Sequence, residues 1–181
     1  MLQAELHNLI RGSRTSTSFV VDHDGGIANA SGSSTGIGNQ TDKKLLSALR
    51  ANAQVVLTSG KTARLDRYRM PKTADLAIFT NAGVGALELK PAAPQRLSVF
   101  GSEVATDFKG ALDYTRSLGY DRVHVEFGLT GFLNILTELD LVLISCVSNS
   151  GPQAFFRRHG LTPTDRFELD DLNVWALSQR G

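Results

Sequence analysis

The amino-acid sequence predicts an α/β fold with three layers, in which a mostly parallel central sheet is flanked by helices on both faces. The alternation of strands and helices along the chain leads to this prediction, and the fold in turn indicates where functional residues lie. Short apolar runs of strand type alternate along the chain with segments whose apolar residues recur at helical spacing. Polar, glycine-bearing segments follow one strand after another, and ligands of such folds bind at the carboxyl ends of the strands. Because the chain has 181 residues and no internal repeat or linker, we expect a single domain over residues 1–181.

The strands are predicted from compact apolar runs and from alternating patterns. The apolar residues Phe19, Val20 and Val21 place a first strand at 16–22. The segment 141–147 is apolar enough to be a central strand, and its Cys146, the only cysteine, is expected to be a small buried hydrophobe. The remaining strands are expected at 54–58, 75–80, 96–100 and 122–126, with a closing strand or hairpin arm at 167–177.

The helices are predicted where apolar residues share one face. One helix is expected to begin near Thr41 as its N-cap, with Asp42 at the positive end of the helix dipole. A second helix at 107–118 is expected to end at Gly119, a suitable left-handed C′ residue. Two more helices are predicted at 4–10 and 129–139, and a loop with room for one helical turn at 59–73.

The composition excludes several classes of protein. The formal net charge is only +1 and the Lys and Arg residues are scattered, so we expect neither nucleic-acid nor membrane binding. No segment has the roughly 20 apolar residues that span a bilayer, and the N-terminus has no cleavage signal, so we expect a cytoplasmic protein. The four histidines lack the spacing of metal ligands, and no metal site is expected.

Two glycine-bearing segments at strand ends have the chemistry of an anion site. The segment 59–62, SGKT, offers backbone N–H groups, hydroxyls and an ammonium to a phosphate, although it lacks the spacing of a P-loop. The segment 126–131, EFGLTG, joins a strand to a helix, and Gly128 allows a close approach of the backbone. Glu126 is either an acceptor for a polar heterocycle or a carboxylate paired with a nearby arginine.

An acidic pair follows the first strand. Asp22 and Asp24 in the sequence VVDHDGG are typical of a phosphohydrolase of the haloacid dehalogenase type. In this alternative Asp22 is the nucleophile and Asp24 the general acid/base, and Ser59 supplies the hydroxyl of a second motif. The magnesium ligands would be Asp170 and Asp171.

Several segments together resemble the reductase family of riboflavin biosynthesis. DGGIA at 24–28 resembles the family's Asp-Gly-x-Ile-Ala, and SSTGI resembles its Ser-rich loop. LLSALRANAQVVLTSGKT at 45–62 resembles the family's "LRA" helix followed by "DAVLVGxGT". RVHVEFGLTGFLNIL at 122–136 resembles "RVLVEGGPTLxxxLL", and LDLVLISCVSNSG resembles the strand that follows. The order and spacing of these segments agree with the family from about residue 19 to residue 151.

The resemblance implies a dihydrofolate-reductase-like fold, NADPH as cofactor, and a small-molecule substrate. The family reduces the ribose ring of a ribosylamino-pyrimidine phosphate, and its members are homodimers. Carried over to this chain, the resemblance implies catalytic roles for Glu126 and Asp24 and substrate contacts for Gly25 and Ser34. The residues implied in cofactor binding are Ser59, Gly60, Thr62, Gly128, Leu129 and Thr130.

A third hypothesis is a catalytically silent relative that binds a nucleotide. Phe127 stands where the family has a glycine, so a bulky ring is expected where the backbone approaches the ligand. The reductase hypothesis requires that the corners around Gly60 and Gly128 lie side by side at one rim of a sheet. It also requires that the ring of Phe127 leave the slot between them open.

Overall fold

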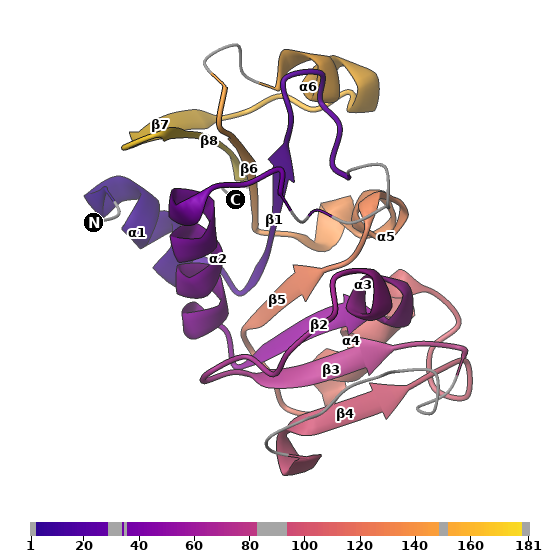
Figure 1. Cartoon of the computed structure of the whole chain (residues 1–181). Helices are drawn as coiled ribbons and strands as arrows, with labels where there is room; N and C mark the ends of the chain where they lie inside the picture. The colour runs from indigo at the N-terminus through magenta and orange to yellow at the C-terminus, as the bar shows by residue number, and fades with distance from the viewer. Residues whose placement is uncertain (1–2, 29–33, 35, 83–93, 149–151, 179–181) are drawn as a thin grey trace. The chain divides into compact units, whose positions relative to one another are not determined.

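The computed structural model has the predicted α/β fold, with mostly parallel strands flanked by helices (Figure 1). It describes residues 3–28, 34, 36–82, 94–148 and 152–178. The chain forms two compact units, the first made of residues 1–49 and 139–181 and the second of residues 50–138. The expectation of a single domain remains a prediction.

The first unit is built on four strands in the order β1-β6-β8-β7. β1 and β6 are parallel, with Val21 opposite Cys146, whereas β8 is antiparallel to both of its neighbours. Apolar residues of α1 and α2 pack on one face of these strands, where Leu6 and Leu45 are buried against Leu143. The elements are α1 (Ala4–Gly12), β1 (Thr15–Val21), α2 (Gln40–Asn52), whose last turn enters the second unit, β6 (Leu141–Cys146), α6 (Gln153–His159), β7 (Asp165–Leu169) and β8 (Leu172–Ser178).

The second unit is built on four parallel strands in the order β4-β3-β2-β5. Side chains of β3 alternate between its two faces: Ile78 packs with Ala63 of α3, and the ring of Phe79 packs against Phe108 of α4. Helices therefore cover both faces of this sheet. The elements are β2 (Val55–Ser59), α3 (Gly60–Leu65), β3 (Asp75–Phe79), the 3₁₀ helix η2 (Pro94–Arg96), β4 (Leu97–Phe100), α4 (Phe108–Ser117), β5 (Val123–Glu126), α5 (Leu129–Asn134) and the 3₁₀ helix η3 (Leu136–Glu138).

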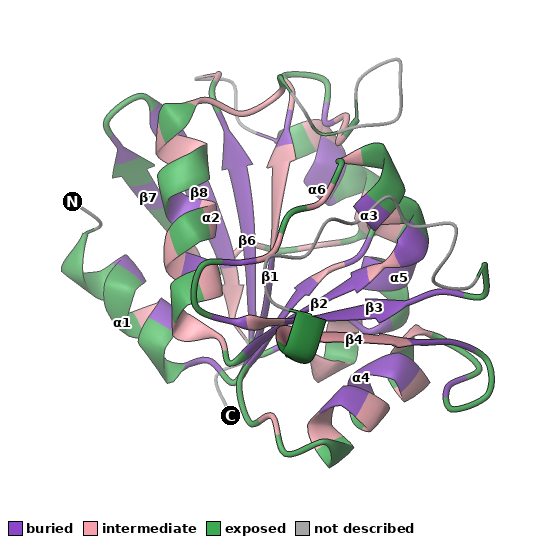
Figure 2. Ribbon diagram, turned by 60° about the horizontal axis from the view of Figure 1, so that its bottom comes forward, coloured by how far each residue is buried: buried purple, intermediate pink, exposed green. Residues whose placement is uncertain are grey.

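Burial follows the pattern expected for strands covered by helices. Most residues of β2, β3, β5, β6 and β8 are buried, while the outer faces of α1, α2 and α4 are exposed (Figure 2). Cys146 is fully buried, as predicted. Among the described residues, no helix combines the length and the apolar character needed to cross a membrane.

Helix α6 lies in no predicted element, and three further details differ from the prediction. α2 is capped by Asn39 rather than by Thr41, because the Asn39 side chain accepts a hydrogen bond from the backbone N–H of Asp42 at 2.9 Å. The expected closing strand is a hairpin of two strands, β7 and β8, whose turn contains Asp170 with a φ of 44°. The last predicted helix ends at Asn134, whose side-chain amide donates to a backbone carbonyl of the same helix and competes with the helical hydrogen bonds.

Candidate functional site

Two helix N-termini lie side by side at the carboxyl edge of the second unit's sheet. β2 and β5 are parallel neighbours with Thr58 opposite Glu126, and a helix follows each of them. A Cβ atom placed on Gly128, at the start of α5, would lie 3.9 Å from Oγ1 of Thr62 in α3. The corners around Gly60 and Gly128 are therefore adjacent, as the reductase hypothesis requires.

The α3 corner is held together by a side-chain cap and by close packing. Oγ of Ser59 accepts a hydrogen bond from the backbone N–H of Thr62 at 3.1 Å and lies 2.9 Å from Oγ1 of Thr62. A Cβ atom on Gly60 would come within 2.3 Å of Oγ1 of Thr80, which follows β3. Glycine is required at position 60 because α3 packs against the end of β3, independently of any ligand.

The α5 corner is open. Gly128 is the N-cap of α5, and no side chain among the described residues caps this helix. Gly128 and Thr130 are exposed and Leu129 is half-buried, so the start of α5 is accessible to solvent. Among the described residues, a Cβ atom on Gly128 would meet no atom closer than Oγ1 of Thr62, so the glycine leaves space for that atom beside α3.

The ring of Phe127 points away from this space. Phe127 is 2% exposed, and its ring centroid lies 4.8 Å from that of Phe108 in α4. A Cβ atom on Gly131 would lie only 2.7 Å from Cβ of Phe127, so the glycine of α5 accommodates the buried aromatic residue. The expectation that a bulky ring occupies the place of ligand approach is therefore wrong.

Glu126 is paired with an arginine, which was one of the two interpretations left open by the sequence. Nε and Nη2 of Arg50, in the last turn of α2, each lie 2.7 Å from one oxygen of the Glu126 carboxylate. The hydroxyl of Tyr68 donates a short hydrogen bond to Oε2 of Glu126. Hydrogen bonding and charge attraction from Glu126 outweigh desolvation and raise the pKa of Arg50. A catalytic role for Glu126 remains a prediction.

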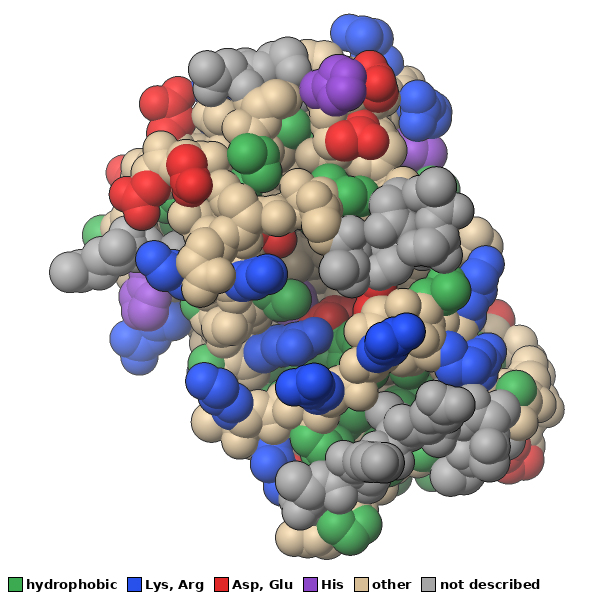
Figure 3. Space-filling view, in the orientation of Figure 1, with side chains coloured by type: hydrophobic (Ala, Val, Ile, Leu, Met, Phe, Trp, Pro, Cys, Tyr) green, Lys and Arg blue, Asp and Glu red, His purple; other side chains and the backbone are tan. Residues whose placement is uncertain are grey.

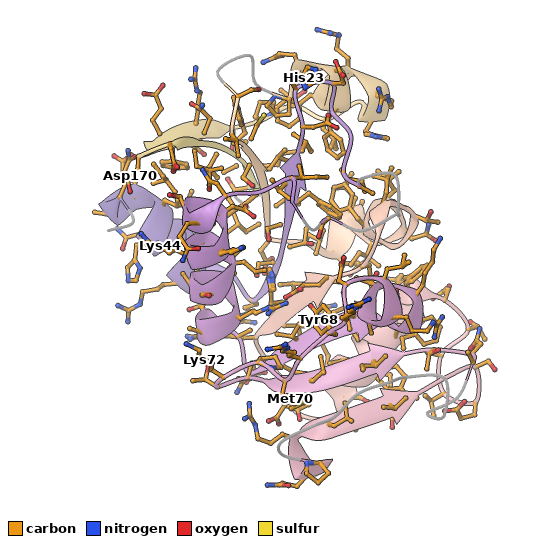
Figure 4. The ribbon with its side chains drawn as sticks, viewed as in Figure 1. His23, Lys44, Tyr68, Met70, Lys72 and Asp170 are labelled. Carbon is orange, nitrogen blue, oxygen red and sulfur yellow. The ribbon has the colours of Figure 1, made fainter. Side chains whose placement is uncertain are left out.

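Tyr68 belongs to a segment that covers one face of β2 and β3. Its backbone N–H donates to the carbonyl of Ala63, which closes the C-terminal end of α3, and Arg67 before it has a φ of 47°. Tyr68 and Met70 pack against the buried cluster that contains Val56 and Ile78 (Figure 4). The ring of Tyr68 lies 5.1 Å from the guanidinium carbon of Arg50, which adds a cation–π contact.

Positive charge is concentrated on α3 and the segment after it. Within 12 positions this stretch has five exposed cationic side chains, and its single acidic residue, Asp66, is half-buried. Lys and Arg side chains gather over this part of the molecule in the space-filling view (Figure 3). The scattered distribution inferred from the sequence is therefore wrong for this surface, whose cations are Lys61, Arg64, Arg67, Arg69 and Lys72.

Asp24, Gly25 and Ser34 lie in the first unit. Asp24 is exposed and pairs with His23 at 3.1 Å. Gly25 has a φ of 79°, and a Cβ atom on it would lie 2.7 Å from the backbone nitrogen of Phe155, so glycine is required there by local geometry. Ser34 is exposed, and its carbonyl accepts a hydrogen bond from the N–H of Ile37.

The structure gives no support to the phosphohydrolase alternative. Oδ1 of Asp22 accepts hydrogen bonds from the backbone N–H groups of Asp24 and Gly26, at 2.9 and 2.7 Å, and so closes the turn after β1. Asp170 and Asp171 lie in the β7–β8 turn, where the Asp171 carboxylate accepts a hydrogen bond from Thr41. These carboxylates have local structural roles.

Two further residues with suitable chemistry were not singled out from the sequence, and a third, Asp42, was expected only at the positive end of a helix dipole. Arg50 and Tyr68 surround Glu126, and no spacing pattern connects residues 76 and 58 positions from it. In the first unit, Oδ1 of Asp42 accepts a hydrogen bond from the hydroxyl of Ser145 at 2.6 Å. Desolvation by burial raises the pKa of Asp42, against the smaller opposing effects of Ser145 and Lys43.

Comparisons with known proteins identify the fold. No family model matches the chain, and no curated protein matches it. A pyrimidine reductase-like protein from Corynebacterium diphtheriae is similar in structure, with a TM-score of 0.66 and 16% identity over 94% of this chain and 93% of that protein. A diaminohydroxyphosphoribosylaminopyrimidine deaminase/5-amino-6-(5-phosphoribosylamino)uracil reductase from Thermotoga maritima has a TM-score of 0.60 and 17% identity over 91% of this chain.

The chain spans 56% of the length of the Thermotoga protein. A dihydrofolate reductase from Enterococcus faecalis, solved with NADP(H), has a TM-score of 0.57 and 11% identity over 92% of this chain and 96% of that protein. At these identities the likeness shows the fold alone. The fold is therefore dihydrofolate-reductase-like, and the structural neighbours are reductases.

Proposed function

We propose that the protein is an NADPH-dependent reductase of the riboflavin-biosynthesis type, acting on 5-amino-6-(5-phosphoribosylamino)uracil or a related pyrimidine. The observation that carries the proposal is the adjacency of the two glycine-bearing corners at Gly60 and Gly128, with open space in front of Gly128. Ligands of open α/β sheets bind at this edge of the strands. The fold, shared with reductases that include one solved with NADP(H), agrees with it.

The residues at the two corners fit the phosphates of a dinucleotide. The first backbone N–H groups of α5, which belong to Leu129 and Thr130, face an anion that approaches the exposed Gly128. Across the gap, Ser59, Gly60 and Thr62 contribute hydroxyls and backbone. The exposed cations of α3, Lys61 and Arg64, attract the negatively charged cofactor to this edge.

The cofactor, when bound, supplies the hydride, and the protein contributes position and electrostatics. In this proposal Glu126 accepts a hydrogen bond from the ligand, while Asp24 and Gly25 shape the substrate side and Ser34 contacts the substrate. A cytoplasmic homodimer belongs to the same proposal. Light scattering coupled to size-exclusion chromatography tests the dimer.

The alternative hypothesis is a relative that binds a nucleotide without catalysis. It was based on a bulky ring at the place of ligand approach, but the ring of Phe127 is buried against α4. Turnover separates the two hypotheses directly. Oxidation of NADPH in the presence of a panel of amino- and ribosylamino-pyrimidines supports the reductase. Binding of NADPH without oxidation across the whole panel contradicts it.

The first test is the shift in melting temperature caused by NADPH. A ligand that binds only the native state stabilises it, by about 2.7 kcal/mol when its concentration is about 100 times its Kd. We expect this shift in the wild type and its loss in Gly128→Leu. Gly12→Leu is the matched control, because a Cβ atom at Gly12 meets no atom of the described residues within 4 Å, and a Cβ atom at Gly128 meets only Oγ1 of Thr62 at 3.9 Å; Gly12 lies at the end of α1. A wild type without any shift at millimolar NADPH refutes the proposal.

A further inference from the structure

The Glu126 carboxylate has most of its acceptor positions occupied from inside the protein. A carboxylate offers roughly four lone-pair positions. Arg50 fills one on each oxygen, and the Tyr68 hydroxyl fills a second on Oε2. Among the described residues, no hydrogen bond fills the second position on Oε1, and the Glu126 side chain is 12% exposed. A ligand at the strand edge therefore meets one oxygen of a carboxylate whose other contacts are already made.

The surroundings fix the rotamer of Glu126 as well as its charge. The guanidinium of Arg50 is planar, so its bidentate contact sets the plane of the carboxylate. The backbone carbonyl of Glu126 accepts a hydrogen bond from Oγ1 of Thr58 on the neighbouring strand, at 2.9 Å. The imidazole of His124, buried two residues earlier, has Nε2 at 3.6 Å from Oε1.

From this geometry we propose that Arg50 and Tyr68 are positioning residues, which hold Glu126 so that its remaining acceptor position receives an O–H or N–H donor of the ligand. The inference rests on the proposed function. Glu126 precedes Gly128 by two residues, and Gly128 faces the cofactor phosphates in that proposal. A group next to those phosphates, such as a ribose hydroxyl, is the donor that this position fits.

Tyr120 supplies a matched control for Tyr68. Its hydroxyl donates to Oδ2 of Asp75 at 2.7 Å, which is the same kind of bond at the opposite end of the strands, where β3 begins. Burial, together with the hydrogen bond and charge of Asp75, raises the pKa of Tyr120 to about 12. Tyr120→Phe therefore removes a comparable hydrogen bond at the end of the strands that lies opposite to the candidate site.

The first arm of the experiment needs no ligand. Unfolding by urea is measured for Tyr68→Phe, Glu126→Gln and the double variant. If the hydroxyl acts on the carboxylate, the two substitutions are non-additive, because Tyr68→Phe removes the hydrogen bond whose charge assistance Glu126→Gln removes. Additive effects overturn the inference, whatever the protein binds.

The second arm measures the Kd for NADPH by calorimetry. We expect Tyr68→Phe to weaken binding about tenfold, since one charge-assisted hydrogen bond orients the acceptor. The same substitution should have no further effect when Glu126 is already Gln. Arg50→Lys keeps the positive charge but loses the bidentate contact, so its affinity for NADPH should lie between those of wild type and Arg50→Gln. Tyr120→Phe should bind NADPH with the affinity of wild type.

The outcomes separate the two proposals. If Tyr68→Phe lowers stability but leaves the Kd for NADPH unchanged, Tyr68 is only structural and the inference is overturned. An equal loss of NADPH affinity in Tyr120→Phe also overturns the inference, because the loss then comes from a general destabilisation of the protein and not from the position of Glu126. Wild-type protein that binds no NADPH refutes the proposed function instead, and this result is recognised before any variant is made.

Discussion

The two glycines of the candidate site should respond in opposite ways to a small side chain. A Cβ atom on Gly60 would overlap Thr80, with Oγ1 at 2.3 Å and Cβ at 2.5 Å. Thr80 is 9% exposed, so it has little room to move. Overpacking of this kind costs about 1–3 kcal/mol, which for a chain of this size lowers the melting temperature by roughly 2–12 °C. Gly60→Ala is therefore expected to be a destabilised protein.

Gly128→Ser is expected to fold as well as wild type. Gly128 has the φ of −66° and ψ of 174° that suit an N-cap, and serine is a better N-cap than glycine by a few tenths of a kcal/mol. Its side chain extends into the space that we assign to the cofactor phosphates. If that space is needed, the clash weakens NADPH binding roughly 5- to 150-fold, from an overpacking cost of about 1–3 kcal/mol.

Both quantities come from the same thermal titration. Each variant is melted without NADPH and with a series of NADPH concentrations, so that stability and affinity are read together. Loss of affinity in Gly128→Ser at unchanged stability supports the site. Unchanged affinity in Gly128→Ser refutes the placement of the phosphates, and a melting temperature of Gly60→Ala equal to wild type refutes the packing argument.

Two further predictions concern single side chains. Ser59→Ala removes the cap of α3 from Thr62 and should cost about 0.5–2 kcal/mol in urea unfolding, whereas Ser59→Asp should keep the cap and weaken NADPH binding through charge repulsion. Burial raises the pKa of the Asp42 carboxyl above its ordinary value and so favours the protonated form, and this contribution to stability is lost as the pH rises through the raised pKa. Asp42→Asn cannot ionise and should not show that loss. In melting curves from pH 3 to pH 7, the melting temperature of the variant should therefore rise relative to that of wild type as the pH rises. A difference in melting temperature that stays constant with pH would contradict a raised pKa for Asp42.

The strand edge was predictable because it depends on local patterns. Apolar runs ending in glycine-bearing polar segments identified β2 and β5, and parallel strands bring such ends to one rim. The pairing of Glu126 was not predictable, because Arg50 is 76 residues away and both interpretations of the carboxylate satisfied the sequence. The cap of α2 was placed two residues late, since Asn39 and Thr41 are both good N-caps and only the backbone conformation distinguishes them.

The two glycine corners show the limit of motif reasoning more clearly. Gly60 and Gly128 both lie where a strand is followed by a helix, Gly60 as the first residue of α3 and Gly128 as the N-cap of α5. Only packing separates them: Thr80 lies against the first, and free space lies in front of the second. A glycine in such a motif therefore indicates close approach, but whether a side chain or a ligand makes the approach depends on the neighbouring strand.

The buried Phe127 illustrates what strand geometry adds to a motif. In extended chain, alternate residues face opposite sides, so a residue between Glu126 and Gly128 points away from the face that those two share. Its ring fills the space beside Phe108. We therefore expect Phe127→Ala to destabilise the protein by about 3–5 kcal/mol, the cost of emptying an aromatic site, while the folded fraction keeps its affinity for NADPH. Urea unfolding and NADPH titration at low temperature test this, with Phe127→Leu as the milder control. A large loss of affinity without loss of stability would instead place the ring in the ligand site and remove the basis for the open slot.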